Sequence, residues 1–350
     1  MTAFILLYCY LFVVWIITLN IRKPTQRRFV QSFASFLGLL FLLGFHSPDL
    51  GCDVVGSYIP AFERTGKHFI TSADYSIFGF ELGYMNYMVL MHHISDNVQF
   101  FLFTTALIIL IPIVYLIYRY SENIMFSVII YTSWYLYYFS FSALRQSIAI
   151  SICAIATLFL FKRKIIPFVL VVFGASTFHT SALLFLIAYP LYVYRLSNKK
   201  LMTLGIIGIA ILILFKNSMQ LVATLFFGSN SRYVESLQSS EFAGFTIAIV
   251  YFVFAMYQMY LDKQSKNPYL PYLFLLTIIQ TTGIYSQTIP RLAYYFIPLF
   301  AISFPLAINS LHKTKRFNVQ TFLIIIFVSF FMMQANGHYL DVTPFKFFWE

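Results

Sequence analysis

Residues 99–118 read QFFLFTTALIILIPIVYLIY, a run without one charged side chain. About 20 apolar residues are enough to cross the hydrocarbon core of a bilayer as an α-helix. Inside the hydrocarbon, a helix satisfies its backbone N–H and C=O groups within its own segment, which an isolated strand cannot do. The run therefore predicts a membrane-spanning α-helix.

Apolar runs of similar character recur on both sides of this segment, and together they predict about twelve spans. The predicted spans are 3–19, 29–45, 99–118, 124–139, 147–161, 165–177, 181–194, 201–215, 244–260, 269–284, 292–309 and 319–334. Two of them, 165–177 and 181–194, are short and are expected to be broken or deeply buried. The pattern predicts an all-α polytopic integral membrane protein, with residues 1–350 forming one transmembrane domain.

The composition excludes a soluble protein. The chain of 350 residues is 60% hydrophobic and 10% charged, whereas a soluble domain carries about 25% charged residues. The first apolar run has no basic region before it and no small-residue cleavage site after it, so it predicts a retained helix rather than a signal peptide. The three cysteines form neither a metal-binding spacing nor a disulfide framework.

The distribution of charge predicts the orientation. If the loop after the first span is cytoplasmic, the cytoplasmic connections carry 16 of the 23 basic residues, and the other side carries ten of the 12 acidic ones. These basic residues are Arg22, Lys23, Arg27, Arg28, Arg119, Lys162, Arg163, Lys164, Arg195, Lys199, Lys200, Lys263, Lys266, Lys313, Lys315 and Arg316. By the positive-inside rule, both termini lie outside. The same rule accounts for the net charge of +11, so no nucleic-acid partner is expected.

Two connections on the predicted outer side are long. Residues 46–98 combine acidic and histidine residues with many aromatic ones, which suggests short helices lying in the membrane interface. Residues 216–243 form the second long connection. The inner connections are all short. Because sites are commonly built from loops on one face of a rigid scaffold, these two loops predict a site on the extracytoplasmic face.

Two arginines at the outer starts of predicted helices are candidates for anion binding. Arg145, followed by Gln146, precedes about four apolar turns, and an ionisable residue at membrane depth is a functional candidate. The alternative is an interfacial arginine whose head reaches water. Arg291 stands in a similar place. Each guanidinium would suit a phosphate or diphosphate, or it could be neutralised by Asp53 or Glu81.

Three residues on the same side could transfer a proton. His179 lies on an outer turn, where its ordinary pKa range would suit general-base chemistry, although it could instead belong to a helix cap. Asp53 and Glu81 are bracketed by apolar and aromatic residues. The adjacent pair His92 and His93 would point apart on a helix, so no shared metal is expected there. No metal cluster, phosphate-binding loop, GxSxG or dinucleotide motif is present in the sequence, so no metal and no cofactor are expected.

These segments together resemble the EpsG-type family of bacterial polysaccharide polymerases, which are Wzy-like O-antigen and exopolysaccharide polymerases. The resemblance covers roughly residues 40 to 305. The pieces that carry it are Gly51-x-Asp53 with Tyr58, Glu81-x-Gly83-Tyr84, Arg145-Gln146-x-x-Ala149, Phe178-His179-x-Ser181-Ala182-Leu183, and Arg291 with Tyr295-Phe296. The Arg-Gln and Phe-His-x-Ser-Ala-Leu pieces are the most specific.

The resemblance implies a metal-independent, GT-C-like membrane glycosyltransferase of the bacterial cytoplasmic (inner) membrane. Its partners would be undecaprenyl-diphosphate-linked oligosaccharide repeat units, the lipid bilayer and a chain-length regulator. The product would be a lipopolysaccharide O-antigen, a capsule or an exopolysaccharide. The growing glycan would move from its lipid diphosphate onto the next lipid-linked unit at the outer face.

This chemistry assigns roles to the candidate residues. Arg145 and Arg291 would bind the diphosphate, and one of His179, Glu81 or Asp53 would accept the proton of the attacking hydroxyl. The expected substrate contacts are Gln146, Ser181, Tyr58, Tyr84 and Tyr295. The sequence leaves three alternatives open: an O-antigen ligase or a membrane acyltransferase, a transporter such as a flippase for the lipid-linked unit, and a structural or assembly subunit. A transporter would place its polar groups nearer the membrane midplane.

Overall fold

The computed structural model describes residues 1–68, 79–214, 243–262, 267–284, 288–336 and 340–350. Throughout these ranges the regular structure is helical and no β-strand is formed, which confirms the predicted all-α class. Extended pairing is limited there to an isolated bridge between His46 and Phe347. The predicted loop 216–243 lies outside the described ranges except at its last residue. The chain divides into two compact units, 1–186 with 311–350 and 187–310, and each is described by itself.

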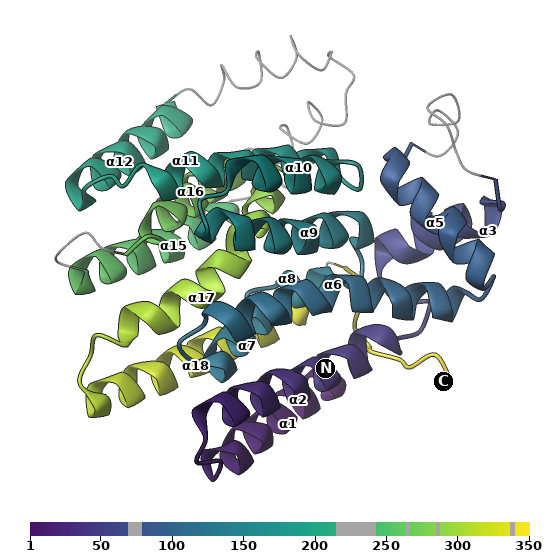
Figure 1. Ribbon diagram of the computed structural model, residues 1–350, viewed down its shortest axis with the longest axis horizontal. Helices are drawn as coiled ribbons and strands as arrows, with labels where there is room; N and C mark the ends of the chain where they lie inside the picture. Colours follow the sequence, from purple (N-terminus) through teal and green to yellow (C-terminus); the bar gives the residue numbers. More distant parts are fainter. Residues whose placement is uncertain (69–78, 215–242, 263–266, 285–287, 337–339) are drawn as a thin grey trace. The chain divides into compact units, whose positions relative to one another are not determined.

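The first unit contains most of the helices. They are α1 (Thr2–Leu19), α2 (Pro24–Gly44), η1 (Val54–Tyr58), α3 (Ile59–Arg64), α5 (Leu82–Ile94), α6 (Val98–Tyr120), α7 (Ile124–Ser133), α8 (Leu136–Phe139), α9 (Leu144–Phe161), α10 (Ile165–Ser176), η3 (Thr180–Ile187, whose last residue belongs to the second unit) and α18 (Lys313–Ala335). Helices α10, α9, α6 and α2 pack side by side in that order (Figure 1).

Helix α6 shows how the sequence forms this layer. Asn97 caps its first turn, because its side-chain oxygen accepts from the N–H of Phe100 at 3.0 Å. Phe101, Thr105 and Ile109 are fully buried at four-residue spacing, so one face of the helix packs on its neighbours. The opposite face keeps Ile111 half exposed. Such an apolar outer face is suited to lipid rather than to water.

Five helical segments within the described residues are long and apolar enough to cross a membrane, and they include α1, α6, α9 and α18. The fifth is the segment Ile289–Ile308, which consists of a 3₁₀-helix followed by an α-helix. Shorter apolar helices are present as well. Only 17% of the most apolar window of α18 is buried inside the protein, and only 28% of that of α1. Exposed apolar surface on this scale indicates a membrane protein.

Helical structure occurs at each predicted span, but four spans are interrupted or change helix type. The predicted spans 269–284 and 292–309 each combine an α-helix with a 3₁₀-helix. The predicted helix 124–139 is divided into α7 and α8, because Tyr135 adopts a left-handed backbone conformation with φ of 70°. The predicted span 181–194 begins as the 3₁₀-helix η3 and continues as α11 (Ala188–Val193). In the predicted loop 46–98, short helices are present as η1, α3 and α5.

The second unit is also helical. After α11 it contains α12 (Asn198–Leu214), α15 (Ala243–Leu261), α16 (Leu270–Thr281), η4 (Thr282–Ile284), η5 (Ile289–Phe296) and α17 (Ile297–Ile308). Helix α16 packs against both α12 and α15. The hydroxyl of Tyr272 joins α16 to α11 by donating to the carbonyl of Ala188 at 2.9 Å.

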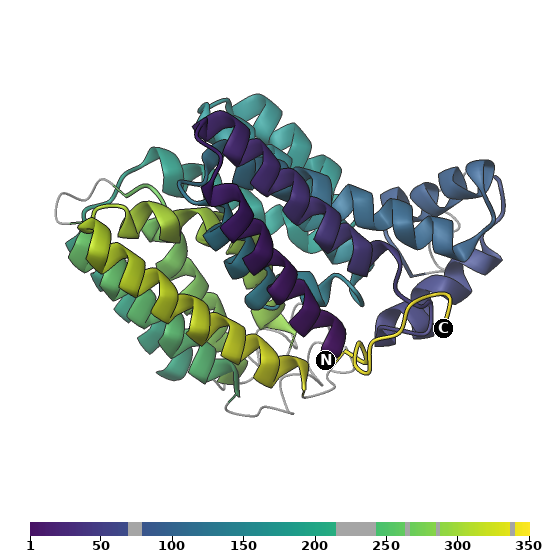
Figure 2. The same ribbon diagram turned by 90° about the horizontal axis from the view of Figure 1, so that it is seen from below.

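The C-terminal segment 340–350 returns to the loop that follows α2 (Figure 2). Four backbone bonds connect the two: Phe348 N donates to Phe45 O at 3.1 Å, Ser47 N to Lys346 O at 2.9 Å, Gly51 N to Asp341 O at 3.1 Å, and Cys52 N to Leu340 O at 3.0 Å. The segment is therefore a structural support for the Gly51-x-Asp53 turn.

Candidate functional site

The site of the first unit is created by a close approach between α5 and the end of α10. Gly83 N donates to Thr177 O at 2.9 Å. A Cβ atom at position 83 would meet Thr177 Oγ1 at 2.3 Å and Thr177 O at 2.7 Å. Only glycine fits this contact. Because Glu81 lies two residues before Gly83, and His179 two residues after Thr177, the contact brings Glu81 against His179.

The Glu81 carboxylate connects two candidate residues that are distant in sequence. Its Oε2 accepts from Arg145 Nη1 at 2.6 Å, and its Oε1 accepts from His179 Nδ1 at 3.0 Å. The backbone N–H of Thr180 donates to the same Oε1 at 3.1 Å. The side chains of Glu81, Arg145 and His179 are 14%, 21% and 28% exposed, so the cluster is shielded yet still reachable by a ligand.

The electrostatics fix the protonation state of Glu81. Burial alone would raise the pKa of the carboxyl, but the hydrogen bond from His179 and the charge of Arg145 outweigh it and lower the pKa to about 2. An ionised carboxylate can only accept, so His179 Nδ1 carries the proton of their hydrogen bond. When the imidazole is neutral, its lone pair is then on Nε2. Among the described residues, Nε2 has no hydrogen-bond partner.

Arg145 lies in the first turn of α9, against aromatic rings. Its Cζ atom is 4.3 Å from the ring centroid of Phe80 and 5.8 Å from that of Tyr58. Phe80, Tyr58 and Tyr84 also contact one another, with centroid distances of 5.4 to 5.7 Å. Arg145 Nε is buried without a hydrogen-bond partner in the described part of the chain. The rings thus hold the guanidinium plane while Glu81 binds one of its edges.

Asp53 is placed beside the turn that leads into α9. Gly51 has φ of +90°, and a Cβ atom there would meet Phe141 O at 2.3 Å, which explains the glycine. Asp53 N donates to Ser142 Oγ at 3.1 Å. Across the described ranges the Asp53 carboxylate forms no salt bridge, whereas Glu81 is the residue that pairs with Arg145. Glu81 therefore neutralises the charge of Arg145.

The predicted substrate contacts occupy different environments. Tyr58 and Tyr84 are buried, 4% and 0% exposed, and pack beside Arg145 rather than facing open space. Gln146 is buried in α9, and Ser181 is half-buried in η3. These four residues belong to the first unit, and their roles in binding a sugar stay predictions.

Arg291 and Tyr295 belong to the second unit. Both lie in η5, where Arg291 N donates to Thr288 O at 3.1 Å, and the Tyr295 side chain is 1% exposed. The cluster around Glu81 is formed by residues of the first unit. The role of Arg291 as a second diphosphate ligand stays a prediction.

Four further residues belong to the first-unit site, although nothing in the sequence marks them as site residues. Phe80 is one of many aromatic residues in its loop, and Thr177, Thr180 and Ser142 are ordinary small polar residues. Gly83 was already part of a quoted motif, and its close contact with Thr177 explains why a glycine is needed there. Within the described residues, no group of three His, Cys, Asp or Glu side chains could hold a metal ion.

Comparison with known proteins supplies the family. No curated protein and no solved structure matches the chain. The model of the EpsG family matches residues 29–347 of the 350, which covers the whole Arg145–Glu81–His179 cluster and begins inside α2. The match agrees with the resemblance carried by the motifs, and it suggests a role of the polysaccharide-polymerase type in membrane polysaccharide biosynthesis. The chain belongs to the EpsG family.

Proposed function

We propose that the protein is a polysaccharide polymerase, a GT-C-like membrane glycosyltransferase with about twelve spans. It transfers the growing glycan from undecaprenyl diphosphate onto an incoming lipid-linked repeat unit. The reaction takes place at the outer face of the bacterial cytoplasmic membrane, with both termini on that side and without a metal. The observation that carries the proposal is the Glu81 carboxylate, which joins the guanidinium of Arg145 to the imidazole of His179.

The reaction breaks one bond and forms one. The bond between the anomeric carbon and the phosphate oxygen breaks, and its electron pair stays on the diphosphate. The acceptor hydroxyl oxygen bonds to the anomeric carbon, and its proton passes to Nε2 of His179. Undecaprenyl diphosphate leaves with more negative charge than it had in the glycosidic linkage. A fixed cation beside it stabilises that charge more in the transition state than in the ground state.

Arg145 supplies this cation. A guanidinium can bind phosphate oxygens with two parallel hydrogen bonds, and the Phe80 ring together with Glu81 keeps it in one orientation. Orientation of this kind lowers the entropy cost of reaching the transition state. Arg291, from the second unit, is proposed as the second diphosphate ligand. Gln146, Ser181 and Tyr295 are proposed to contact the substrate.

Of the three proposed bases, His179 fits the geometry best. Glu81, with a pKa of about 2, is a weak base near neutral pH. Its two oxygens are also already bound by Arg145, His179 and Thr180. Glu81 is therefore a positioning residue, which holds His179 in the tautomer with Nε2 available. Asp53, which forms no salt bridge within the described residues, is the second candidate for the base.

The experiment that tests the function is a gel of surface glycan from the source strain. We expect deletion of the gene to leave a lipid core with one repeat unit, and complementation to restore the ladder. Complete loss of repeat-unit glycan would indicate a ligase or a flippase instead. An unchanged ladder would refute the proposal.

A matched pair of arginine variants then tests the site. Arg145→Gln should abolish the ladder at a normal level of membrane protein, whereas Arg119→Gln, at the far end of α6, should leave the ladder unchanged. In bilayer nanodiscs with purified lipid-linked repeat units, Arg145→Gln should lose polymer formation while wild type elongates. Equal ladders for both variants would remove Arg145 from the site.

A further inference from the structure

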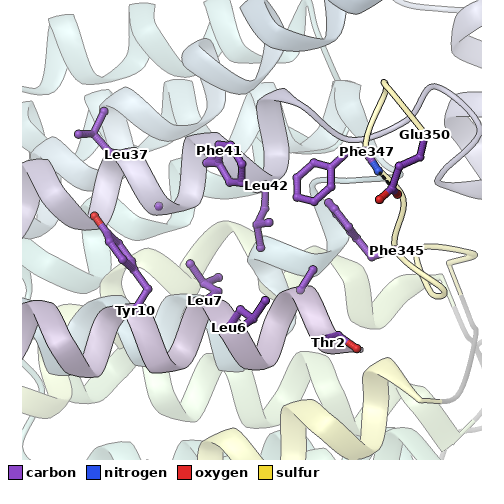
Figure 3. A pocket seen from close by; sticks show the side chains of 12 residues that line it. Thr2, Leu6, Leu7, Tyr10, Leu37, Phe41, Leu42, Phe345, Phe347 and Glu350 are labelled. Atoms are coloured by element: carbon purple, nitrogen blue, oxygen red, sulfur yellow. Dashed lines mark hydrogen bonds between the residues drawn. The ribbon is translucent and has the colours of Figure 1, made fainter.

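An apolar pocket lies between α1 and α2, away from the Glu81 cluster. Its volume is about 550 Å³, within the range of roughly 300–1,000 Å³ that small-molecule sites occupy. The apolar wall is formed by Leu6, Leu7, Leu37, Phe41, Phe345 and Phe347. Figure 3 shows these side chains between the two helices and the C-terminal segment. Leu6 and Phe41 are 63% and 49% exposed, so the pocket is open to the surroundings of α1.

One end of the pocket is closed by Tyr10. Its hydroxyl donates to Ala34 O at 2.8 Å. A Cβ atom on Gly38 would meet the Tyr10 ring at 2.5 Å, so the glycine lets the ring lie against α2. Thr2 and Glu350 form the opposite end, as Figure 3 shows. The pocket is therefore a blind groove, with apolar walls and polar groups at one end.

The length of the groove matches one leaflet of a bilayer. From Thr2 to Tyr10 the rise of α1 is about 12 Å, at 1.5 Å per residue. Half of a hydrocarbon core of about 30 Å is about 15 Å. A groove of this depth holds the chain of a lipid that belongs to a single leaflet. A long polyprenyl chain would extend past the Tyr10 end.

The charge at the polar end selects the headgroup. Glu350 Oε2 accepts from Phe347 N at 3.0 Å, and in the described part of the chain the carboxylate forms no salt bridge. A carboxylate beside the headgroup repels a diphosphate and attracts an ammonium group. A lipid ammonium group would therefore suit this end of the groove better than a phosphate would.

We propose that this groove is a binding site for one acyl chain of an ethanolamine phospholipid, whose ammonium group pairs with Glu350. The bound chain packs against Phe345 and Phe347, and Phe347 stacks on Trp349 with ring centroids 4.5 Å apart. Those residues belong to the segment 340–350 that is bonded to the turn at Gly51 and Cys52. The lipid thus supports the turn that carries Asp53. The proposal does not depend on the polymerase function.

The test uses the full chain reconstituted in nanodiscs that contain equal amounts of phosphatidylethanolamine and phosphatidylglycerol. Native mass spectrometry after mild release counts the lipids that stay bound. We expect one retained phosphatidylethanolamine, favoured over phosphatidylglycerol by about tenfold, which corresponds to about 1.4 kcal/mol. Equal retention of the two lipids, or no retained lipid, would overturn the proposal. So would displacement by added undecaprenyl phosphate, because the substrate tail would then be the occupant.

Variants of adjacent residues on α1 provide the control. Leu6→Trp fills the groove and should remove the retained lipid, whereas Ile5→Trp, at an exposed neighbour that does not line the groove, should keep it. Glu350→Gln should retain a lipid but lose the preference for ethanolamine. Because Leu6 and Ile5 are both exposed, neither change disturbs packed core. Retention by Leu6→Trp, or an unchanged preference in Glu350→Gln, would contradict the proposal.

Discussion

Two histidines in the first unit each bond a carboxylate through Nδ1, yet they differ at the other nitrogen. His179 contacts Glu81 at 3.0 Å, and its Nε2 has no partner among the described residues. His92 contacts Asp96 at 2.7 Å, and its Nε2 contacts the carbonyl of Phe62 at 2.7 Å. The carboxylates differ as well, because Glu81 is 14% exposed and Asp96 is 69% exposed.

The difference separates a structural histidine from a reactive one. His92 is held at both nitrogens, and its ring stacks on Phe62 with centroids 4.0 Å apart. Both bonds form together only when both nitrogens carry protons. His92 therefore joins α3 to α5, and no acceptor site is left for a substrate proton. His179 is held at one nitrogen only, which leaves the other available for chemistry.

The largest effect should come from exchanging each histidine for glutamine. His179→Gln keeps a donor for Glu81 but removes the base, so polymer formation should fall by about 10²- to 10⁴-fold. His92→Gln should lower stability by about 1–3 kcal/mol through the lost bonds, with polymer formation retained at low temperature. Initial rates in nanodiscs and thermal unfolding measure the two effects. A His179→Gln variant with the wild-type rate would make the two histidines equivalent.

The two carboxylates should differ in their contribution to stability. Glu81→Gln leaves Arg145 without its counter-charge, which for a largely shielded pair costs about 3–5 kcal/mol. Asp96→Asn, at an exposed side chain, should leave the thermal unfolding temperature close to that of wild type. Thermal unfolding in the same detergent compares the variants. Similar losses would show that the shielding of Glu81 has no energetic consequence.

Lowering the pH should destabilise the folded protein through Glu81 over a defined pH range. Because the folded protein lowers the pKa of Glu81 from 4.5 to about 2, the ionised carboxylate contributes stability above pH 4.5. That contribution, about 3 kcal/mol, is lost as the pH falls from 4.5 to 2. The pKa of Asp96 is also lowered, by the hydrogen bond from His92 and the charge of Lys67. Unfolding curves of wild type and of Asp96→Asn should show this loss of stability between pH 4.5 and 2. The Glu81→Gln variant should lack most of the loss.

The smallest effect is expected at the aromatic ring beside Arg145. Phe80→Leu removes a cation–π contact of about 0.5–2 kcal/mol, so the KM for the lipid-linked donor should rise by up to about tenfold while kcat changes less. Phe80→Tyr should restore the wild-type KM, because it keeps the ring. Steady-state kinetics in nanodiscs measure both. If Phe80→Leu lowered kcat and left KM unchanged, the ring would not act by placing the phosphate-binding cation.

Hydropathy predicted the helix positions because each span is a local pattern of apolar residues. The break at Tyr135 was not predicted, because it depends on one left-handed residue inside an apolar run. Arg145 and His179 were identified as candidates from their motifs. The pairing of Glu81 with Arg145 was one of the alternatives that the sequence left open, beside pairing with Asp53. The bond of Glu81 to His179 was not predicted, since it joins residues 98 positions apart. It depends on the contact of Gly83 with Thr177, which no local pattern encodes.

The order of the three site residues along the chain bears on how the protein enters its membrane. A ribosome makes Glu81 before Arg145, and Arg145 before His179. Arg145 lies in the first turn of α9, where insertion costs less than the roughly 2.5–3.5 kcal/mol of an arginine at the helix centre, and a waiting carboxylate can reduce that cost as α9 is inserted. His179 then arrives at a carboxylate that already holds Arg145. Translation thus delivers the anion first and its two partners afterwards.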